Sequence, residues 1–385
     1  MRLGNRQHLA YCTNIHPAES WEETFHALNT HTLAVKRAVC PDGDFAIGLR
    51  LSDRASRELS DPVVLRDFRQ WLKRERCYVF AINGFPFGRF HGTRVKERVF
   101  QPDWRSAERL DYTKRLFDLL VQLDPPDGEA SVSTLPGSFK AFIETGADEV
   151  RICENLWRCV EHVAELSRQT GLDLHLGVEP EPLGWFENSA ETLGFFERME
   201  TMRPGDERLH RHLGVNYDTC HFAIQYEEPH EALTAFRKSG VRISKVHLSS
   251  AIRAIPDGET RAALAKFSEQ TYLHQVVARR ASGELDRYRD LDEALAAFEE
   301  HGEWRVHFHI PLHCPAYGWL QPTSDHVEGT LDFLSENPAT CRHLEMETYT
   351  WEVLPEGLKS ATVEEQLERE YAWCLGAFDA RGMRS

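Results

Sequence analysis

Residues 172–179 read Leu-Asp-Leu-His-Leu-Gly-Val-Glu, and they show the strand pattern most clearly. Its apolar residues Leu174, Leu176 and Val178 occupy alternate positions, which is the pattern of a β-strand with one apolar face. In a barrel strand, that face points outward to the helices, and the residues between point inward. The strand therefore ends with Glu179 on the inward face.

A helical pattern precedes this strand. From Asp148 to Gln169, apolar residues recur at three- and four-residue steps. Gly171 stands just past the end, where a helix C-terminal glycine is expected. Strands and helices alternate in this way along the chain, which favours a parallel sheet, either closed as a barrel or open and doubly wound.

Two missing motifs decide between these architectures. An open dinucleotide-binding sheet is expected to carry G-x-G-x-x-G directly after an early strand, and the sequence has none there. A phosphate loop, G-x-x-x-x-G-K-[ST], is also absent from the sequence. We therefore predict an α/β fold of the (β/α)8 TIM-barrel type, as a single domain over residues 1–385.

Nine segments read as strands, one more than an eight-stranded barrel uses. They are Leu9–Asn14, Phe45–Ser52, Tyr78–Asn83, Ala130–Leu135, Leu172–Glu179, Leu213–Asp218, Ile243–His247, Val306–Ile310 and Leu344–Glu347. The strand outside the barrel is expected to be Val306–Ile310 or a neighbour in the long stretch before Leu344.

That stretch contains further elements. Residues 272–279 and 284–288 flank Ala-Ser-Gly and read as a small hairpin. We predict that residues 251–313 form an inserted segment of hairpin, helix and strand. It lies between the strands that end at His247 and Glu347.

Four predicted strands end in an inward ionisable residue, namely Glu179, Asp218, His247 and Glu347. The C-terminal ends of barrel strands form the rim where active sites are built. Three carboxylates that converge there repel one another unless a cation lies between them. Three oxygen ligands and one imidazole suit Mn²⁺, Mg²⁺, Fe²⁺, Co²⁺ or Zn²⁺, with positions left open for substrate oxygens.

Each of the four also has a simpler interpretation. Glu179 can be a turn carboxylate, with Glu181 as the ligand in its place. Asp218 can cap the helix that follows it. His247 can be a buried core histidine, and Glu347 can be one of several surface carboxylates.

More histidines lie near the predicted barrel mouth. His221 follows Asp218 by three residues, and it is a candidate to bind a second metal, to contact a substrate hydroxyl or to remain in water. His307 and His309 share one strand face, and His309 is the better placed as a further metal ligand. The pair is a candidate second metal site or a pair of hydrogen-bond donors to the ligands.

The ends of the N-terminal strands supply a candidate substrate-binding wall. Asn14, His16, Asn83 and Trp185 combine polar groups with an aromatic ring, which suits a small polar ligand. We also expect Glu181 and His307 to belong to this substrate-binding wall. Phe87, Phe90 and His91 extend this wall. Ordinary tight turns are the alternative interpretation.

Composition and net charge limit the classes of binding partner and the cellular compartment that we expect. With 45 basic and 61 acidic residues the net charge is −16, so we expect no nucleic-acid partner. The nine cysteines form no C-x-x-C pair and favour free thiols in a reducing compartment. No apolar run has the length of a membrane span or signal peptide, so we expect a cytoplasmic protein.

The strand-end sequences resemble those of a known superfamily. Val-Glu179-Pro-Glu, Tyr-Asp218-Thr-Cys-His221, Val-His247-Leu and Met-Glu347-Thr are similar to the xylose isomerase-like TIM barrels. Within that superfamily, Tyr-Cys-Thr-Asn-Ile-His-Pro at 11–17, Asn83-Gly-Phe-Pro-Phe-Gly, Phe90-His91-Gly and His307-Phe-His-Ile-Pro resemble the EboE family, which is associated with metabolite traffic. The likeness extends over nearly the whole chain.

This resemblance implies roles for the strand-end residues. In the ketose 3-epimerases of the superfamily, Glu, Asp, His and Glu in this order hold one divalent metal, and the two glutamates lie on opposite faces of the sugar. Carried over, Glu179 and Glu347 are metal ligands and the acid/base pair, Asp218 and His247 complete the ligand set, and His221 contacts substrate. The long segment between His247 and Glu347 departs from the epimerase pattern.

Three functions are compatible with these features. The leading hypothesis is a metal-dependent sugar or sugar-phosphate isomerase or epimerase that acts on a small polyhydroxy carbonyl compound through an enediolate. The second is a non-catalytic metabolite-binding or trafficking protein on the same barrel. The third is a multi-metal phosphoesterase similar to endonuclease IV. The expected macromolecular partners are further copies of the chain or Ebo operon proteins.

Overall fold

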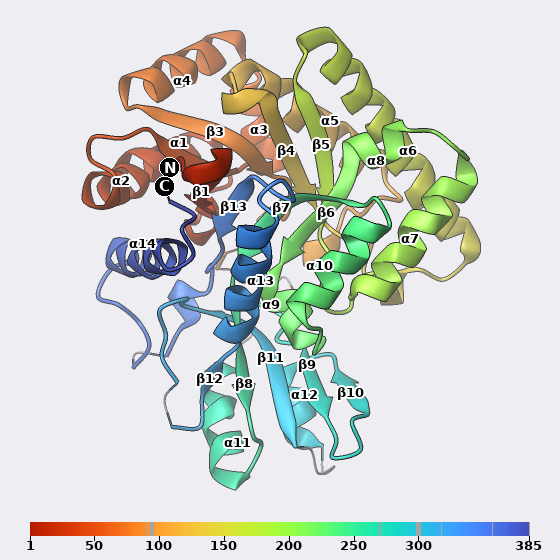
Figure 1. Ribbon diagram of the computed structural model, residues 1–385, viewed down its shortest axis with the longest axis vertical. Coiled ribbons are helices and arrows are strands. Elements are labelled where there is room, and N and C mark those ends of the chain that lie inside the picture. The colour runs from red at the N-terminus through yellow and green to blue at the C-terminus, as the bar shows by residue number, and fades with distance from the viewer. Residues whose placement is uncertain are drawn as a thin grey trace.

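The computed structural model describes residues 1–89, 91–92, 96–268, 271–297, 302–316, 318–355 and 357–384. Its main sheet has eight parallel strands in the spatial order β1-β13-β7-β6-β5-β4-β3-β2. Their bounds are β1 His8–Tyr11, β2 Phe45–Arg50, β3 Cys77–Asn83, β4 Glu129–Thr134, β5 Asp173–Val178, β6 Leu213–Asp218, β7 Arg242–Leu248 and β13 His343–Met346. A parallel bridge from Cys12 to Gly48 joins the two edge strands. The predicted (β/α)8 barrel is confirmed (Figure 1).

Helices surround the barrel and cover the outward faces of its strands (Figure 1). They are α1 Trp21–Ala27, α2 Leu33–Val39, α3 Asp53–Leu59, α4 Pro62–Arg74, α5 Ala107–Leu120, α6 Gly146–Thr170, α7 Ser189–Met202, α8 Arg208–His212, α9 Thr219–Ile224, α10 Pro229–Lys238, α13 Ser324–Glu336 and α14 Val363–Asp379. The two chain ends meet, because the Gly4 amide donates to the Met383 carbonyl over 2.9 Å.

The helix α6 forms where the apolar periodicity predicts it. Thr145 and Asp148 form a capping box at its start. Gly171 ends it with φ 74°, a left-handed conformation that glycine adopts without strain. Leu156, Val160 and other apolar residues of its inner face are buried against the barrel, so packing stabilises the helix along its length.

The segment between β7 and β13 forms a second, antiparallel sheet. Its order is β10-β9-β11-β8-β12, with bounds β8 Ser250–Ala254, β9 Val276–Arg279, β10 Leu285–Tyr288, β11 Glu303–Ile310 and β12 Gln321–Pro322. Two helices accompany it, α11 Gly258–Leu264 and α12 Leu291–Ala296. The predicted strand Val306–Ile310 lies in β11, outside the barrel. Figure 1 shows this inserted sheet below the barrel.

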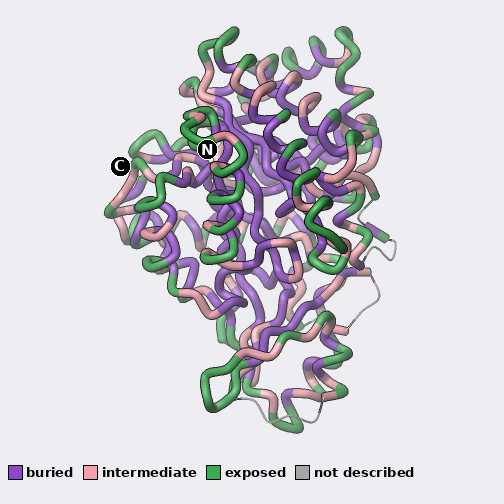
Figure 2. Tube along the Cα trace, turned by 90° about the vertical axis from the view of Figure 1, so that its right-hand side faces the viewer, coloured by how far each residue is buried: buried purple, intermediate pink, exposed green. Residues whose placement is uncertain are grey.

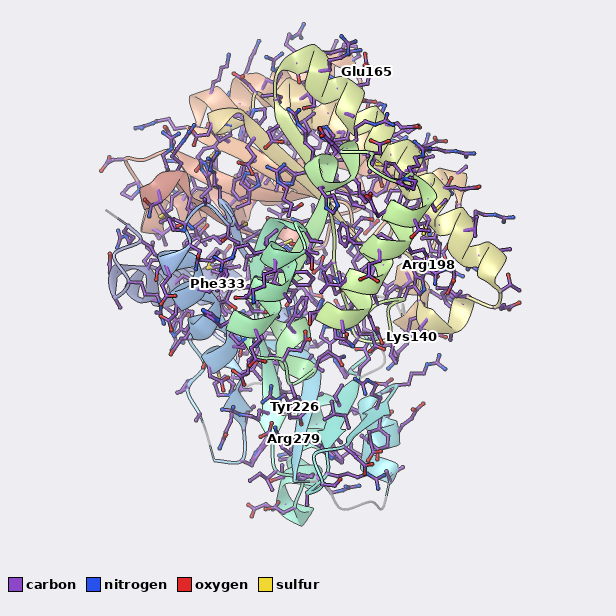
Figure 3. The ribbon with its side chains drawn as sticks, turned by 45° about the vertical axis from the view of Figure 1, so that its right-hand side comes forward. Lys140, Glu165, Arg198, Tyr226, Arg279 and Phe333 are labelled. Atoms are coloured by element: carbon purple, nitrogen blue, oxygen red, sulfur yellow. The ribbon has the colours of Figure 1, made fainter. Side chains whose placement is uncertain are left out.

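The inserted sheet has its own apolar core and a polar junction with the barrel. Trp304, Val306 and Phe308 of β11 are fully buried in that core. At the junction, the guanidinium groups of Arg305 and Arg279 lie 4.0 and 4.5 Å from the ring centre of Tyr226, which follows α9. Figure 3 labels Tyr226 and Arg279 at this contact. The junction therefore fixes the sheet beside the barrel mouth.

The barrel interior is buried, whereas exposed segments lie mainly on the outer helices and the loops of the inserted sheet (Figure 2). Gly48 of β2 shows how close the packing is. A side-chain carbon there would come within 2.4 Å of the Glu345 carboxyl and 2.6 Å of the Tyr11 carbonyl. Among the described residues, no helix has the length and apolarity needed to cross a membrane.

Candidate metal centre

The structure brings the four predicted strand-end residues to one point. Glu179 follows β5, Asp218 ends β6, His247 lies in β7 and Glu347 follows β13. Each offers one ligand atom, and these four atoms lie within 4.8 Å of one another. The Nδ1 atom of His247 is 3.0 Å from Glu347 Oε2, 3.1 Å from Glu179 Oε1 and 3.6 Å from Asp218 Oδ2.

The electrostatics of this cluster require positive charge at its centre. Burial opposes the imidazolium form of His247, yet the carboxylates of Glu347 and Glu179 raise its pKa well above the ordinary value. Burial likewise opposes ionisation of Glu179 and Asp218, but His247 lowers the pKa of Glu179. Together, His221 and His247 lower the pKa of Asp218 well below its ordinary value.

Neighbouring groups hold the carboxylates in place. Asn14 Nδ2 donates to Glu347 Oε1 over 2.7 Å. Asp218 Oδ1 accepts from the Cys220 amide over 2.7 Å, so this residue does cap α9, as its simpler interpretation requires. The hydroxyl of Ser249 also donates to Oδ1. The second oxygen, Oδ2, is buried without a hydrogen-bond partner among the described residues and lies toward His247.

This donor set fits a divalent cation. The three carboxylates and the imidazole are all buried. When His247 is protonated, its single positive charge faces three negative groups. A divalent cation in place of that proton offsets more of the repulsion, and the mixed oxygen and nitrogen set matches Mn²⁺, Mg²⁺, Fe²⁺, Co²⁺ or Zn²⁺. The residues are therefore a candidate metal centre.

A buried ion pair lies beneath this cluster, and the sequence analysis missed it. Lys245 Nζ is 3.3 Å from Glu345 Oε2, and both side chains are fully buried. Glu345 Oε1 in turn lies 3.7 Å from His247 Nε2, on the ring edge opposite the other carboxylates. Burial alone would raise the pKa of Glu345, but Lys245 and His247 lower it to about 2. Glu345 therefore acts on His247 through its charge, because 3.7 Å is longer than a hydrogen bond.

The cluster forms the floor of a cavity at the barrel mouth. The polar lining consists of Asn14, Asn83, Lys96, Glu179, Glu181, His221, His247, Gln275, His307 and Glu347. The apolar and aromatic lining consists of Phe85, Pro86, Val99, Phe100, Tyr272, Leu273 and Tyr349. Of the predicted wall residues, the structure places Asn14, Asn83, Glu181 and His307 against this cavity.

Glu181 differs from its neighbour Glu179. Burial raises its pKa well above the ordinary value, and the charges of Glu179 and Glu347 raise it further. Burial and these charges therefore favour the protonated carboxyl of Glu181, which can donate a hydrogen bond. It lies with His221 and His307 in a second group whose ligand atoms are within 4.8 Å of one another.

Two predicted wall residues do not line the cavity. His16 turns away from the mouth, where its Nε2 is 3.0 Å from the Tyr11 hydroxyl and its ring stacks on His31. Trp185 packs on Phe195, and the Arg198 guanidinium lies 5.8 Å from its ring centre. The Trp185 amide donates to the Ser138 carbonyl over 2.8 Å, so this residue lies against the loop that follows β4.

The remaining predicted wall residues are Phe87, Phe90 and His91. Phe87 packs edge-on against Tyr112, away from the cavity floor. His91 Nε2 donates to the Asn14 carbonyl over 2.5 Å, so it supports the wall from behind. Phe90 lies outside the described residues.

No family model matches the chain, and no curated protein sequence matches it. A xylose isomerase-like TIM-barrel protein from Mycobacterium smegmatis, in complex with magnesium, is 13% identical over 99% of both chains, with a TM-score of 0.56. A xylose isomerase domain protein from Alicyclobacillus acidocaldarius is 11% identical over 98% of this chain and 99% of its own, with a TM-score of 0.53. The IolI protein with a bound zinc atom is 11% identical over 97% of this chain and 99% of its own, with a TM-score of 0.50. The chain therefore has the fold of the xylose isomerase-like TIM barrels.

Proposed function

We propose that this protein is a metal-dependent isomerase or epimerase that acts on a small polyhydroxy carbonyl compound. One observation carries the proposal. Two carboxylates from separate strands, Glu179 and Glu347, lie 3.1 and 3.0 Å from the same atom of His247, at the floor of the cavity. This geometry supplies both a cation site and two proton-transfer groups.

The two glutamates divide the proton transfer between them. One carboxylate removes the proton from the carbon next to the substrate carbonyl, and the other returns a proton from the opposite side, which inverts that carbon. A divalent cation held by Glu179, Asp218, His247 and Glu347 would stabilise the negative charge of the enediolate. His221 and the neutral acid Glu181 then hold substrate oxygens by hydrogen bonds.

The cavity walls match a substrate of this class. Asn14 offers its amide oxygen Oδ1, which has no hydrogen-bond partner among the described residues, to a hydroxyl, whereas the rings of Tyr272 and Tyr349 offer apolar faces to the carbon skeleton. Lys96 also lines the cavity, but its Nζ donates to Asp290 Oδ2 over 2.5 Å, so its charge is already offset by that carboxylate.

We also propose which metals the site accepts and which family the chain belongs to. The metal is one of Mn²⁺, Mg²⁺, Co²⁺, Fe²⁺ or Zn²⁺, and the chain is an EboE-type protein concerned with metabolite traffic. Support for this family comes from the motifs around Asn14, Asn83 and His307. Oligomerisation or association with Ebo operon proteins follows from that assignment.

Solvent deuterium exchange tests the proposal. The metal-stripped protein is loaded with Mn²⁺ or Co²⁺ and incubated in D₂O with a panel of ketoses and ketose phosphates. We expect deuterium at the carbon next to the carbonyl, and a loss of about 10²-fold or more in Glu179→Gln and Glu347→Gln. The matched control is Glu165→Gln, which removes a carboxylate from the exposed surface of α6 (Figure 3).

Two results would argue against an isomerase. No exchange across the panel, with metal verified in the protein, would contradict the proposal. Stoichiometric metal together with a tightly retained small molecule and no turnover would instead indicate a metabolite carrier.

A further inference from the structure

A chain of hydrogen bonds runs from the inserted segment between β7 and β13 to Glu347, one of the two proposed proton-transfer groups. Tyr272 lies in that segment, before β9, and its hydroxyl is 3.0 Å from His91 Nδ1. His91 Nε2 lies 2.5 Å from the backbone carbonyl of Asn14. The side-chain amide of Asn14 then donates to Glu347 Oε1 over 2.7 Å. All four side chains are buried.

The chemistry of each group fixes the direction of every hydrogen bond in this chain. A backbone carbonyl only accepts, so Nε2 of His91 carries the ring proton. Burial lowers the pKa of His91 to about 4, so the ring is neutral at pH 7 and its Nδ1 accepts. The Tyr272 hydroxyl therefore donates to His91. A carboxylate also only accepts, so the amide nitrogen of Asn14 faces Glu347.

Contacts on both sides of Tyr272 hold its backbone in place. The amide of Lys96 donates to the Thr271 carbonyl over 3.2 Å, and the Nζ of Lys96 donates to Asp290 Oδ2 over 2.5 Å. The other oxygen of this carboxylate, Oδ1, accepts from the His274 amide over 3.1 Å. The residues before and after Tyr272 are thus both bonded, so its hydroxyl is presented to His91 from a fixed backbone.

The inserted segment also contacts Glu347 at the main chain. His309 of β11, a candidate metal ligand on the sequence evidence, has its Nδ1 atom 2.9 Å from the Glu347 carbonyl and donates to it. The hydroxyl of Thr350 in turn donates to the His309 carbonyl. The inserted segment therefore holds the main chain of Glu347 directly and its carboxylate through two intermediate residues.

We propose that Tyr272 is a positioning residue for Glu347 and acts through His91 and Asn14. The inference rests on the proposed function, in which Glu347 transfers a proton and holds the cation. A general base acts only at a fixed distance and angle from the carbon that it deprotonates, so a carboxylate released from Asn14 loses rate. The inserted segment then takes part in the reaction and is more than a wall of the cavity.

Deuterium exchange in Tyr272→Phe tests this role, because the substitution keeps the ring in the cavity wall and removes only the hydroxyl. We expect kcat for exchange to fall about 10-fold with KM little changed, and Mn²⁺ affinity in calorimetry to fall by a similar factor. The matched control is Tyr226→Phe. It removes hydroxyl bonds to the Val277 and Glu303 carbonyls of the inserted sheet, outside the cavity, and should match the wild type.

A double-variant cycle separates positioning from a general structural effect. Asn14→Ala removes the last hydrogen bond of the chain but keeps the backbone carbonyl that His91 contacts. If Tyr272 acts along this chain, Tyr272→Phe should cause no further loss of kcat or of Mn²⁺ affinity in the Asn14→Ala background. Losses that multiply would overturn the proposal, and so would wild-type kcat and Mn²⁺ affinity in Tyr272→Phe.

A crystal structure of Tyr272→Phe gives a readout that needs neither the reaction nor a metal. We expect the Glu347 carboxylate to leave Asn14 or to occupy more than one rotamer. A carboxylate that keeps one rotamer and stays 2.7 Å from Asn14 Nδ2 would overturn the proposal. If the wild type exchanges no deuterium but this displacement is seen, the isomerase reaction is contradicted and the positioning of Glu347 by Tyr272 is supported.

Discussion

Lys245→Met tests the buried ion pair between Lys245 and Glu345 beneath the metal centre. The substitution keeps much of the side-chain volume but leaves the carboxylate of Glu345 buried without its counter-ion. Although burial opposes it, the pKa of Glu345 is held at about 2, against an ordinary value of 4.5, largely by Lys245. If the substitution returns the pKa of Glu345 to its ordinary value, the free energy of unfolding falls by about 3 kcal/mol at pH 7. This is the range expected when one partner of a buried pair is removed.

The sign of the pH dependence follows from the same shift. A carboxyl whose pKa is lowered on folding adds stability above its unfolded value, and this contribution is lost as the pH falls toward the folded value. The deficit of Lys245→Met should therefore be full at pH 7 and shrink between about pH 4.5 and pH 2. The double variant Lys245→Met with Glu345→Gln should recover much of the loss, since no buried charge is left unpaired.

Urea unfolding of the metal-free protein measures this effect, provided that tryptophan fluorescence and circular dichroism give coincident transitions. The control is Arg168→Met, which breaks an exposed pair with Glu165 and should cost less than about 1 kcal/mol. The reasoning would be refuted if Lys245→Met lost under about 1 kcal/mol, or if its deficit were equal at pH 7 and pH 3.

Three further perturbations test separate parts of the structure. Burial raises the pKa of Glu370 to about 8, so its contribution to stability is present below about pH 4.5 and lost as the pH rises through 8. Glu370→Gln should therefore have a higher melting temperature than the wild type at pH 9. An unchanged pH profile of the melting temperature would contradict this. Tyr226→Leu removes the hydrogen bond from its hydroxyl to the Glu303 carbonyl and the ring beneath two arginines, at a cost of about 1–3 kcal/mol. Limited proteolysis should then cut the inserted sheet faster than in the wild type. An equal cleavage rate would show that Tyr226 does not hold the sheet to the barrel. Asn14→Ala frees one oxygen of Glu347 and should weaken Mn²⁺ binding about 10- to 100-fold in calorimetry. An unchanged affinity would show that this hydrogen bond does not orient the ligand.

Much of the fold could be predicted because barrel strands obey a simple period. The alternation in residues 172–179 separates inward from outward side chains, and the strand-end rule then places Asp218 beside His247, as the β6–β7 register shows. The same alternation puts Lys245 on the inward face with His247. The strand-end rule does not select Lys245, because this residue lies two positions before His247, where the predicted strand ends.

Other features depend on contacts between distant parts of the chain. Trp185 packs on Phe195 of α7, and His16 stacks on His31, so distant contacts set the directions of both side chains. Neither sequence period nor turn chemistry specifies these directions. The approach of His307 to His221 likewise depends on how the inserted sheet docks, which no local pattern reveals.

Anomalous scattering from a manganese-soaked crystal, measured at the manganese absorption edge, locates the cation. We predict an anomalous peak within coordination distance of Glu179, Asp218, His247 and Glu347. A peak elsewhere, or no peak at full soaking concentration, would contradict it.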